Sequence, residues 1–308
     1  MPRLIDYLRS QGLTNRQARD LLDTGKVMYC GVPTADGGRE VDAAQITVQR
    51  DAPRIRPNRD LAIIHRDPHM VVVYKPPGML SVPSPGRRDV KSVIGVVRHF
   101  LGAAFPVHRL DESTSGLMMV ALTEQCQQLI KEILFNHRVE RAYLAIVSGW
   151  FPKEPCTVRT QLVRNRGDGL RGSAVEGGED GAKEAVTHLR LREYLGKNAS
   201  LVEARLETGR THQVRIHLSE KRHPILGDDL YAPPAFVRAS PRLALHAFKL
   251  GFKHPVTGEN LAFEAPLADD LEALRRRLLR TPGQGANPAS ASTRSPGRSR
   301  SGRRQSRR

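Results

Sequence analysis

The chain has 308 residues, a formal net charge of +17 and three cysteines. This length can bury a sizeable core and favours two domains. The sequence has no apolar run of about eighteen residues and no signal-like N-terminal segment, so we expect a cytoplasmic protein that does not span a membrane. An odd number of cysteines without a C-x-x-C spacing argues against a disulfide framework and a structural zinc site. The positive charge favours a polyanionic partner.

The first fifty residues predict a small domain with two helices. Apolar residues from Leu4 to Leu8 have the spacing of a short helix. A second helix begins at a capping box formed by Thr14 and Gln17, and we expect it to end at Gly25. Its apolar face consists of Ala18, Leu21 and Leu22.

A small sheet follows these helices in the prediction. Residues 27–29 read as a strand, Cys30 and Gly31 as a turn, and residues 41–48 as a turn into a closing strand. Three basic residues lie on or beside the second helix: Arg16, Arg19 and Lys26. The order of helices and strands resembles the RNA-binding domain of the ribosomal S-four type, which implies that these residues contact RNA. A solvated basic helix face without a ligand is the alternative.

Residues 51–60 have the composition of a linker, and we expect a second domain over residues 61–280. Residues 70–74 are mostly β-branched and predict a strand that ends at a turn beginning with Lys75. Lys75 either contacts phosphate or closes this turn. The next helix is expected over residues 92–101. Its predicted inward face consists of Val93, Val96, Val97 and Phe100.

The stretch from His108 to Leu117 places a carboxylate, Asp111, in a turn rich in hydroxyl groups. The turn follows Arg109 and precedes an apolar run that reads as a buried strand. On composition alone, Asp111 and its serine and threonine neighbours could simply shape the turn through hydrogen bonds to the backbone.

Beyond this stretch, Thr123 is expected to cap a helix that runs to about Asn136. Its predicted core stripe is Leu129, Ile130, Ile133 and Leu134. Residues 141–147 predict a strand with Tyr143 near its start, a position more typical of half-buried packing than of catalysis. Residues 163–183 form a glycine-rich, charged loop, and alternating residues predict neighbouring strands at 186–195 and 201–207.

A third informative stretch runs from Thr208 to Asp228. We expect Thr211 to cap a short helix on which Thr211 and Arg215 share a face. His212 and His217 are five residues apart, which does not fit a helical metal site, so we interpret them as structural or RNA-contacting.

The C-terminal part of the second domain predicts a hairpin, with strands at 246–252 and 261–265. A final helix is expected over residues 269–280, acidic at its start and rich in arginine at its end. Its docking residues are Leu271, Leu274 and Leu278.

Three motifs together resemble the RluA family of pseudouridine synthases over roughly residues 61–274. They are His108-Arg109-Leu110-Asp111 with Thr114-Ser115-Gly116-Leu117, then Lys75-Pro76-Pro77-Gly78, and the Thr208 to Asp228 stretch. The resemblance implies an α+β fold, a pseudouridine synthase core with a mainly antiparallel mixed sheet flanked by helices. It also implies a cofactor-free and metal-free reaction that breaks the bond between uridine N1 and C1′, turns the base and rejoins it through C5.

The same resemblance implies roles for individual residues. Asp111 would be the catalytic carboxylate and Arg215 its partner, since a nearby opposite charge favours the ionised form. Tyr143 would stack on the target base. Arg109 and Lys75 are predicted to contact RNA.

We therefore predict an isomerase that converts uridines of structured RNA to pseudouridine, with large-subunit ribosomal RNA as the expected partner. Transfer RNA is the competing substrate. Two other classes stay open: a non-catalytic RNA-binding or ribosome-assembly protein, and a glycosylase that releases uracil. We expect a monomer.

Residues 281–308 predict a disordered tail rich in arginine and serine. The tail has seven arginines, no acid and no aromatic or branched apolar residue, so it cannot bury enough surface to fold. Without this tail, residues 1–280 still carry a formal net charge of +10. The tail either pairs with phosphates or only increases solubility.

Overall fold

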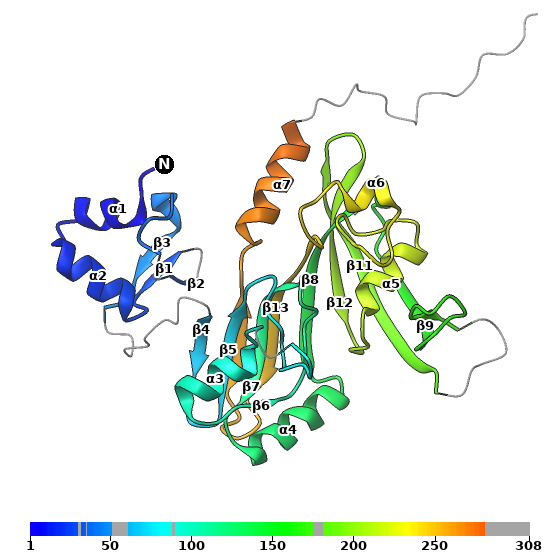
Figure 1. The fold of residues 1–308 in the computed structure, drawn as a ribbon, viewed down its shortest axis with the longest axis horizontal. Coiled ribbons are helices and arrows are strands. Elements are labelled where there is room, and N and C mark those ends of the chain that lie inside the picture. The colour runs from blue at the N-terminus through cyan, green and yellow to red at the C-terminus, as the bar shows by residue number, and fades with distance from the viewer. Residues whose placement is uncertain (30–31, 35, 51–60, 88–89, 175–180, 281–308) are drawn as a thin grey trace, which may run out of the picture.

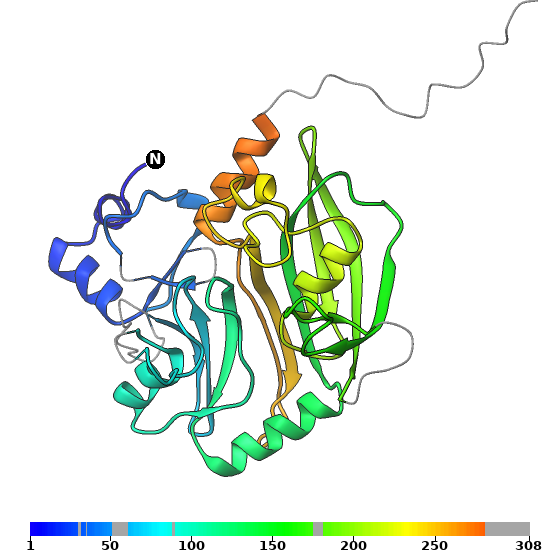
Figure 2. The same ribbon diagram turned by 45° about the vertical axis from the view of Figure 1, so that its right-hand side comes forward.

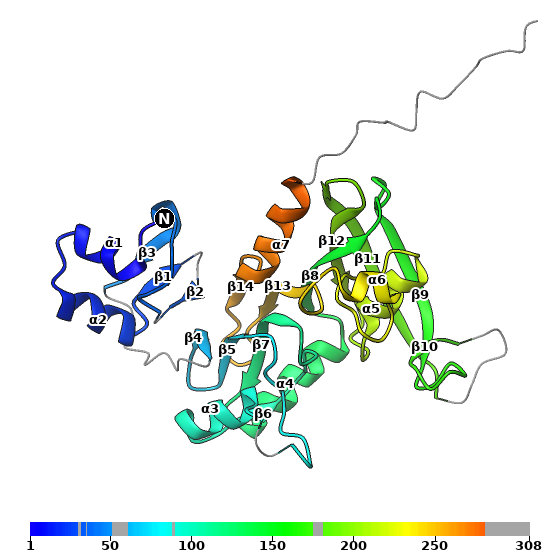
Figure 3. The same cartoon turned by 45° about the horizontal axis from the view of Figure 1, so that its top comes forward.

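The computed structural model describes residues 1–29, 32–34, 36–50, 61–87, 90–174 and 181–280. The N-terminal elements lie beside one edge of a large sheet in all three views (Figures 1, 2 and 3). Two predicted segments, the linker at 51–60 and the tail at 281–308, fall outside the described residues, as does the predicted turn at Cys30 and Gly31.

The N-terminal elements follow the predicted order of helices and strands. They are α1 (Leu4–Ser10), α2 (Asn15–Asp23), β1 (Val27–Tyr29), β2 (Val32–Pro33), the 3-10 helix η1 (Ala43–Gln45) and β3 (Ile46–Val48). The capping box of α2 is confirmed, because Thr14 Oγ1 accepts from Gln17 N at 3.2 Å and Gln17 Oε1 accepts from Thr14 N at 2.9 Å. These elements share a small core of their own: Leu4, Leu8, Ala18, Leu22, Val27 and Val41.

The large sheet has eleven strands, and its main path runs β10-β9-β11-β12-β8-β13-β7-β5-β4, with β14 beside β13 and β6 beside β7. The strands are β4 (Ala62–Arg66), β5 (Met70–Lys75), β6 (Phe105–Pro106), β7 (Ser115–Ala121), β8 (Val139–Ser148), β9 (Cys156–Val163), β10 (Gly172–Ser173), β11 (Lys183–Leu195), β12 (Ala199–Leu206), β13 (Leu245–Lys253) and β14 (Asn260–Glu264). Among the described strands, β7 and β13 pair in parallel and the other neighbours are antiparallel. The predicted mainly antiparallel mixed sheet is confirmed.

Five helices accompany this sheet in the described residues: α3 (Val93–Leu101), α4 (Glu124–Phe135), α5 (Gln213–Glu220), α6 (Pro234–Val237) and α7 (Asp269–Arg280). In Figures 1 and 2, α7 lies toward the top of the sheet and α4 runs along its lower end. Thr123 caps α4 as predicted, accepting from Cys126 N at 3.1 Å. Leu271 and Leu274 bury the inner face of α7, also as predicted. None of the described helices has the length and hydrophobicity needed to cross a bilayer.

One predicted core residue of α3 is wrong. Phe100 is 56% exposed, whereas Ile94, which the prediction left out, is 2% exposed. The buried stripe of α3 passes through Ile94 and Val97 and continues to the partly buried Leu101. Phe100 is one residue before Leu101 in this stripe. Because successive residues of a helix are rotated by about 100° around its axis, the side chain of Phe100 points into solvent.

Close packing between β7 and β13 depends on a glycine. Gly116 has a φ of 117°, and a Cβ at this position would lie 2.1 Å from the carbonyl oxygen of Ala247 on β13. No other residue type fits there without displacing the backbone. This contact positions the start of β7, and with it the turn that carries Asp111.

Candidate active site

Asp111 lies in the turn that enters β7, and hydrogen bonds hold the turn on both sides of it. On the N-terminal side, Ser81 Oγ donates to the carbonyl of Leu110 at 2.6 Å and accepts from Leu110 N at 2.9 Å. On the other side, Lys75 Nζ donates to the carbonyl of Glu112 at 2.8 Å. The backbone around the carboxylate is therefore fixed by side chains distant in the sequence.

Lys75 closes the turn that begins with it and also holds the turn of Asp111, which argues against the predicted contact with RNA phosphate. Its side chain is fully buried, and Nζ also donates to the carbonyls of Pro76 at 3.0 Å and Met79 at 2.8 Å. These bonds use all three donors of an ammonium group. Burial lowers the pKa of Lys75 to about 7.

Arg242, which the sequence did not single out, also holds the turn of Asp111. Its guanidinium donates to the carbonyl of Ser113 and to Ser115 Oγ, both at 3.1 Å. It also forms a two-bond ion pair with Asp270 of α7, at 2.5 and 2.8 Å. Arg242 thus connects α7 to the turn of Asp111.

The start of α5 differs from the prediction that Thr211 caps it. The N-cap residue is His212, in the left-handed conformation with a φ of 60°, and no side chain caps the helix there. Instead, Gln213 anchors this end: its Oε1 accepts from Thr208 Oγ1 at 2.8 Å and from Arg210 N at 3.0 Å. Anchoring by Gln213 fixes the direction in which α5 presents Arg215.

Arg215 connects three carboxylates, and its closest partner is one that the sequence analysis gave no role. Its Nε and Nη2 donate to Asp228 at 2.9 and 2.6 Å, and Nη2 reaches Asp229 at 3.1 Å. The remaining nitrogen, Nη1, lies 3.4 Å from Asp111 Oδ2. Although burial opposes the charge, the bonds to Asp228 and the nearby carboxylates raise the pKa of Arg215 above its usual value.

Asp228 is itself held by the backbone. Its Oδ1 accepts from the amides of Leu230 and Tyr231, both at 3.0 Å, and its side chain is 1% exposed. The signal in the sequence was the Gly227-Asp228 pair at the end of the third motif. This pair did not reveal its role, because no local sequence pattern shows that Asp228 forms an ion pair with Arg215.

Two histidines predicted as structural or RNA-contacting lie in different surroundings. His212 Nε2 is 3.7 Å from Asp111 Oδ1, and its Nδ1 is 2.9 Å from the hydroxyl of Tyr231. Burial lowers the pKa of His212, which favours the neutral ring near the carboxylate. His217 is buried and bonds Thr187 at 2.8 Å and Thr160 at 3.0 Å, so its role is structural.

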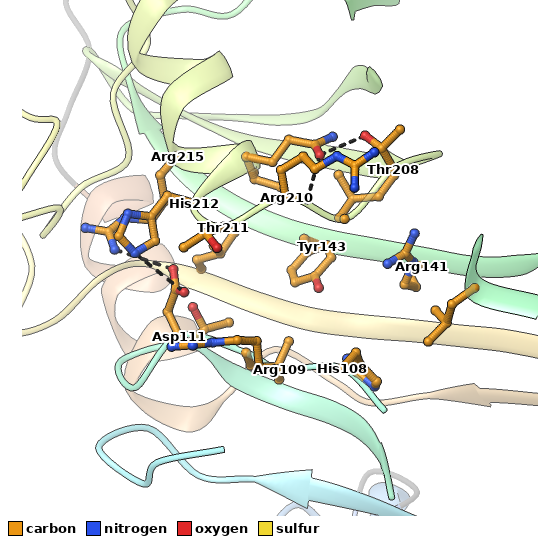
Figure 4. A pocket seen from close by; sticks show the side chains of 18 of the residues that line it. His108, Arg109, Asp111, Arg141, Tyr143, Thr208, Arg210, Thr211, His212 and Arg215 are labelled. Atoms are coloured by element: carbon orange, nitrogen blue, oxygen red, sulfur yellow. Dashed lines mark hydrogen bonds and ion pairs between the residues drawn. The ribbon is translucent and has the colours of Figure 1, made fainter. Parts of the chain in front are cut away.

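A cavity of about 520 Å³ connects these groups. Its lining includes Asp111, Tyr143 and Arg215, together with three further arginines: Arg109, Arg141 and Arg210. Figure 4 shows the ring of Tyr143 between the segment of Asp111 and the segment that runs from Thr208 to Arg215. Burial raises the pKa of Tyr143, so the phenol stays protonated at neutral pH. Of the lining residues, Asp111 is the one carboxylate.

The other predicted RNA-binding residues are not all in one place. Arg109 is exposed at the cavity, whereas Arg16 and Arg19 are exposed on α2. Lys26 donates to the carbonyl of Arg50 beside the small sheet. The N-terminal basic residues therefore do not line the cavity.

The fold and the site together define a class of protein. Residues 69–220 match the family described as RNA pseudouridylate synthase. The human protein RNA Pseudouridylate Synthase Domain Containing 1 has a similar structure, with a TM-score of 0.57 and 28% sequence identity over 73% of this chain and 97% of that one.

Individual relatives include two bacterial proteins named ribosomal large subunit pseudouridine synthase D. The one from Neisseria meningitidis serogroup A is 41% identical over 176 residues, which cover 54% of this chain and 46% of that protein. The one from Zymomonas mobilis is 41% identical over 187 residues, which cover 58% of each chain. The matched part thus spans about half the length of these relatives.

Proposed function

We propose that this protein is an RNA pseudouridine synthase. The observation that carries the proposal is a single carboxylate, Asp111, fixed in a cavity 3.4 Å from the guanidinium of Arg215 and sharing that cavity with Tyr143. A volume of about 520 Å³ lies in the range of pockets that enclose small molecules, and a nucleoside is of that size class. The target uridine would enter this cavity after leaving the RNA stack.

The residues match the demands of the reaction. Cleaving a glycosidic bond requires an ionised, positioned carboxylate, as nucleophile or as stabiliser of a ribosyl cation, and Asp111 would supply it. Arg215 would orient Asp111 through the contact of Nη1 with Oδ2. Tyr143 would stack on the uracil and use its hydroxyl to move a proton at C5 after the base has turned.

The proposed substrate is large-subunit ribosomal RNA. Two relatives carry that substrate in their names, and the body of this chain has the positive charge that binding to phosphates requires.

We assign residues 1–50 to an RNA-binding domain of the ribosomal S-four type, in which Arg16 and Arg19 face solvent. Residues 61–280 form the proposed catalytic domain, where Arg109 contacts RNA. The protein would act as a cytoplasmic monomer.

Chemical mapping of pseudouridines in total RNA, with and without this protein, tests the proposal. We expect one or a few uridines of large-subunit ribosomal RNA to lose their modification when the gene is deleted and regain it when the gene is restored. A change confined to transfer RNA would correct the substrate. Tight RNA binding without any pseudouridine would indicate a non-catalytic protein, and free uracil would indicate a glycosylase.

A further inference from the structure

Phe135 is the most exposed large hydrophobic side chain in the described part of the chain, with 82% of its surface accessible. It is the last residue of α4, and it lines the same cavity as Asp111, next to Leu134. A ring this exposed contributes little to the core. Its position at the cavity of Asp111 points to contact with a ligand.

The backbone that carries Phe135 is firmly held. The amide of Arg138 bonds the carbonyl of Ile133 at 2.8 Å and closes the end of the helix. His137 takes a left-handed conformation with a φ of 55°, and its Nδ1 lies 2.7 Å from the carbonyl of Glu207, just beyond β12. The end of α4 is therefore fixed to the sheet, and Phe135 is presented from a rigid support.

Two arginines that line the same cavity as Phe135 carry charges that fit a phosphate. Arg141 and Arg210 line the same cavity, and each donates to one backbone carbonyl, Arg141 to Glu207 at 3.0 Å and Arg210 to Glu184 at 2.9 Å. The Nε of Arg141 is buried and has no hydrogen-bond partner. A buried donor without a partner is costly, and an oxygen atom of a bound ligand would satisfy it.

We propose that Phe135, Arg141 and Arg210 form a subsite for a second nucleotide of the RNA. Phe135 stacks on the base of a nucleotide adjacent to the uridine in the cavity, and the two arginines bind the phosphate between them. An aromatic ring next to arginines is the combination that holds unpaired nucleotides, because every base has a face that can stack. The proposal rests on the proposed function, since it requires RNA as the substrate.

The subsite is tested by measuring the affinity of the full chain for short single-stranded RNAs. Each RNA has a central uridine and either normal neighbours or an abasic nucleotide on its 5′ or 3′ side. Loss of one base–aromatic stack weakens binding roughly 5- to 150-fold. We expect that loss in the parent protein for one of the two abasic RNAs, and in Phe135→Ala for the intact RNA.

The abasic RNA should then bind equally to the parent and to Phe135→Ala, because both lack the same contact. Phe135→Trp should restore the affinity for intact RNA and Phe135→Leu should not. Phe100→Ala is the matched control: this exposed phenylalanine lies on α3, away from the cavity lining, and its removal should leave affinity unchanged. If Phe135→Ala binds intact RNA as tightly as the parent does, the subsite is refuted.

Pseudouridine formation in the same samples reports on the proposed function separately. Pseudouridine formed without any dependence of binding on Phe135 would refute the subsite and leave the proposed function standing. Binding that depends on Phe135, without pseudouridine from any RNA supplied, would support the subsite and contradict the proposed function. Weakened binding of Phe135→Ala that does not depend on the neighbouring base would also refute stacking, and would indicate contact with another part of the RNA.

Discussion

Arg215 and Asp228 form the closest ion pair of the site, with Nη2 2.6 Å from Oδ1 and Nε 2.9 Å from Oδ2. Both side chains are nearly inaccessible to solvent. Two bonds from one edge of the guanidinium fix its plane and leave Nη1 directed at Asp111, 3.4 Å away. Asp228 therefore positions the arginine on which the orientation of Asp111 depends.

The variant Asp228→Asn should lose stability and activity together. Removing one partner of a buried ion pair costs roughly 3–5 kcal/mol, because the other charge stays buried without compensation. Denaturant unfolding measures the first effect and kcat the second. Asp229→Asn is the control for stability, since Asp229 contacts the same guanidinium but its side chain is 77% exposed. An equal, small change in both variants would contradict the role of Asp228.

The variant Lys75→Met should lower kcat and leave the affinity for RNA within a few-fold. Lys75 holds the carbonyl of Glu112 next to Asp111, and leaving its buried acceptors without a donor costs about 1–3 kcal/mol. A phosphate contact would have the opposite signature, weaker RNA binding with an unchanged kcat. Lys253→Met, at an exposed lysine at the end of β13, controls for loss of a positive charge.

The two substitutions at Tyr143 should separate stacking from proton transfer. Tyr143→Phe keeps the ring and removes the hydroxyl, so RNA affinity should persist while kcat falls by about 100-fold or more. Tyr143→Ala should lose both. If Tyr143→Phe turns over like the parent, the hydroxyl has no part in the chemistry and the ring acts only by packing.

Stability should fall in mild acid because of buried histidines. Burial lowers the pKa of His217 and of His246 to about 4, from 6.5. Between these values the unfolded chain binds protons that the folded chain does not, so the free energy of unfolding decreases as the pH falls from 6.5 to 4. Above pH 6.5 both states are neutral at these sites and the contribution is constant.

Urea unfolding at several pH values measures this dependence. The variant His217→Gln should show a shallower decline than the parent, because one of the titrating groups is gone. A decline of the same steepness in both proteins would show that His217 is not among the groups responsible.

Local signals in the sequence predicted local structure well. The capping box at Thr14 and the cap at Thr123 fixed the starts of α2 and α4, because each depends on residues within one helical turn. The start of α5 was predicted wrongly for the same reason. Its anchor, Gln213, bonds residues on β11, including the carbonyl of Val186 at 3.0 Å, a partner that no local pattern can reveal.

The site was only partly predictable. Asp111 and Arg215 are 104 residues apart, and their pairing was expected from a family resemblance and not from periodicity. Asp228, Arg242 and Phe135 were missed as site residues. Arg242 bonds Ser113 and Ser115 more than a hundred residues away, so the order of strands in the sheet had to be known first. Asp228 bonds Arg215 through a turn whose shape no local pattern reveals.

The most direct test of the central claim is pseudouridine formation by Asp111→Asn on large-subunit ribosomal RNA. Asparagine keeps the shape of the side chain and removes its charge. Product should fall below about 1% of the parent rate, a loss of at least ~2.7 kcal/mol of transition-state stabilisation. RNA affinity should stay within a few-fold, because most of it comes from phosphate contacts. An Asp111→Asn protein that forms pseudouridine at close to the parent rate would contradict the assignment of Asp111 as the catalytic carboxylate.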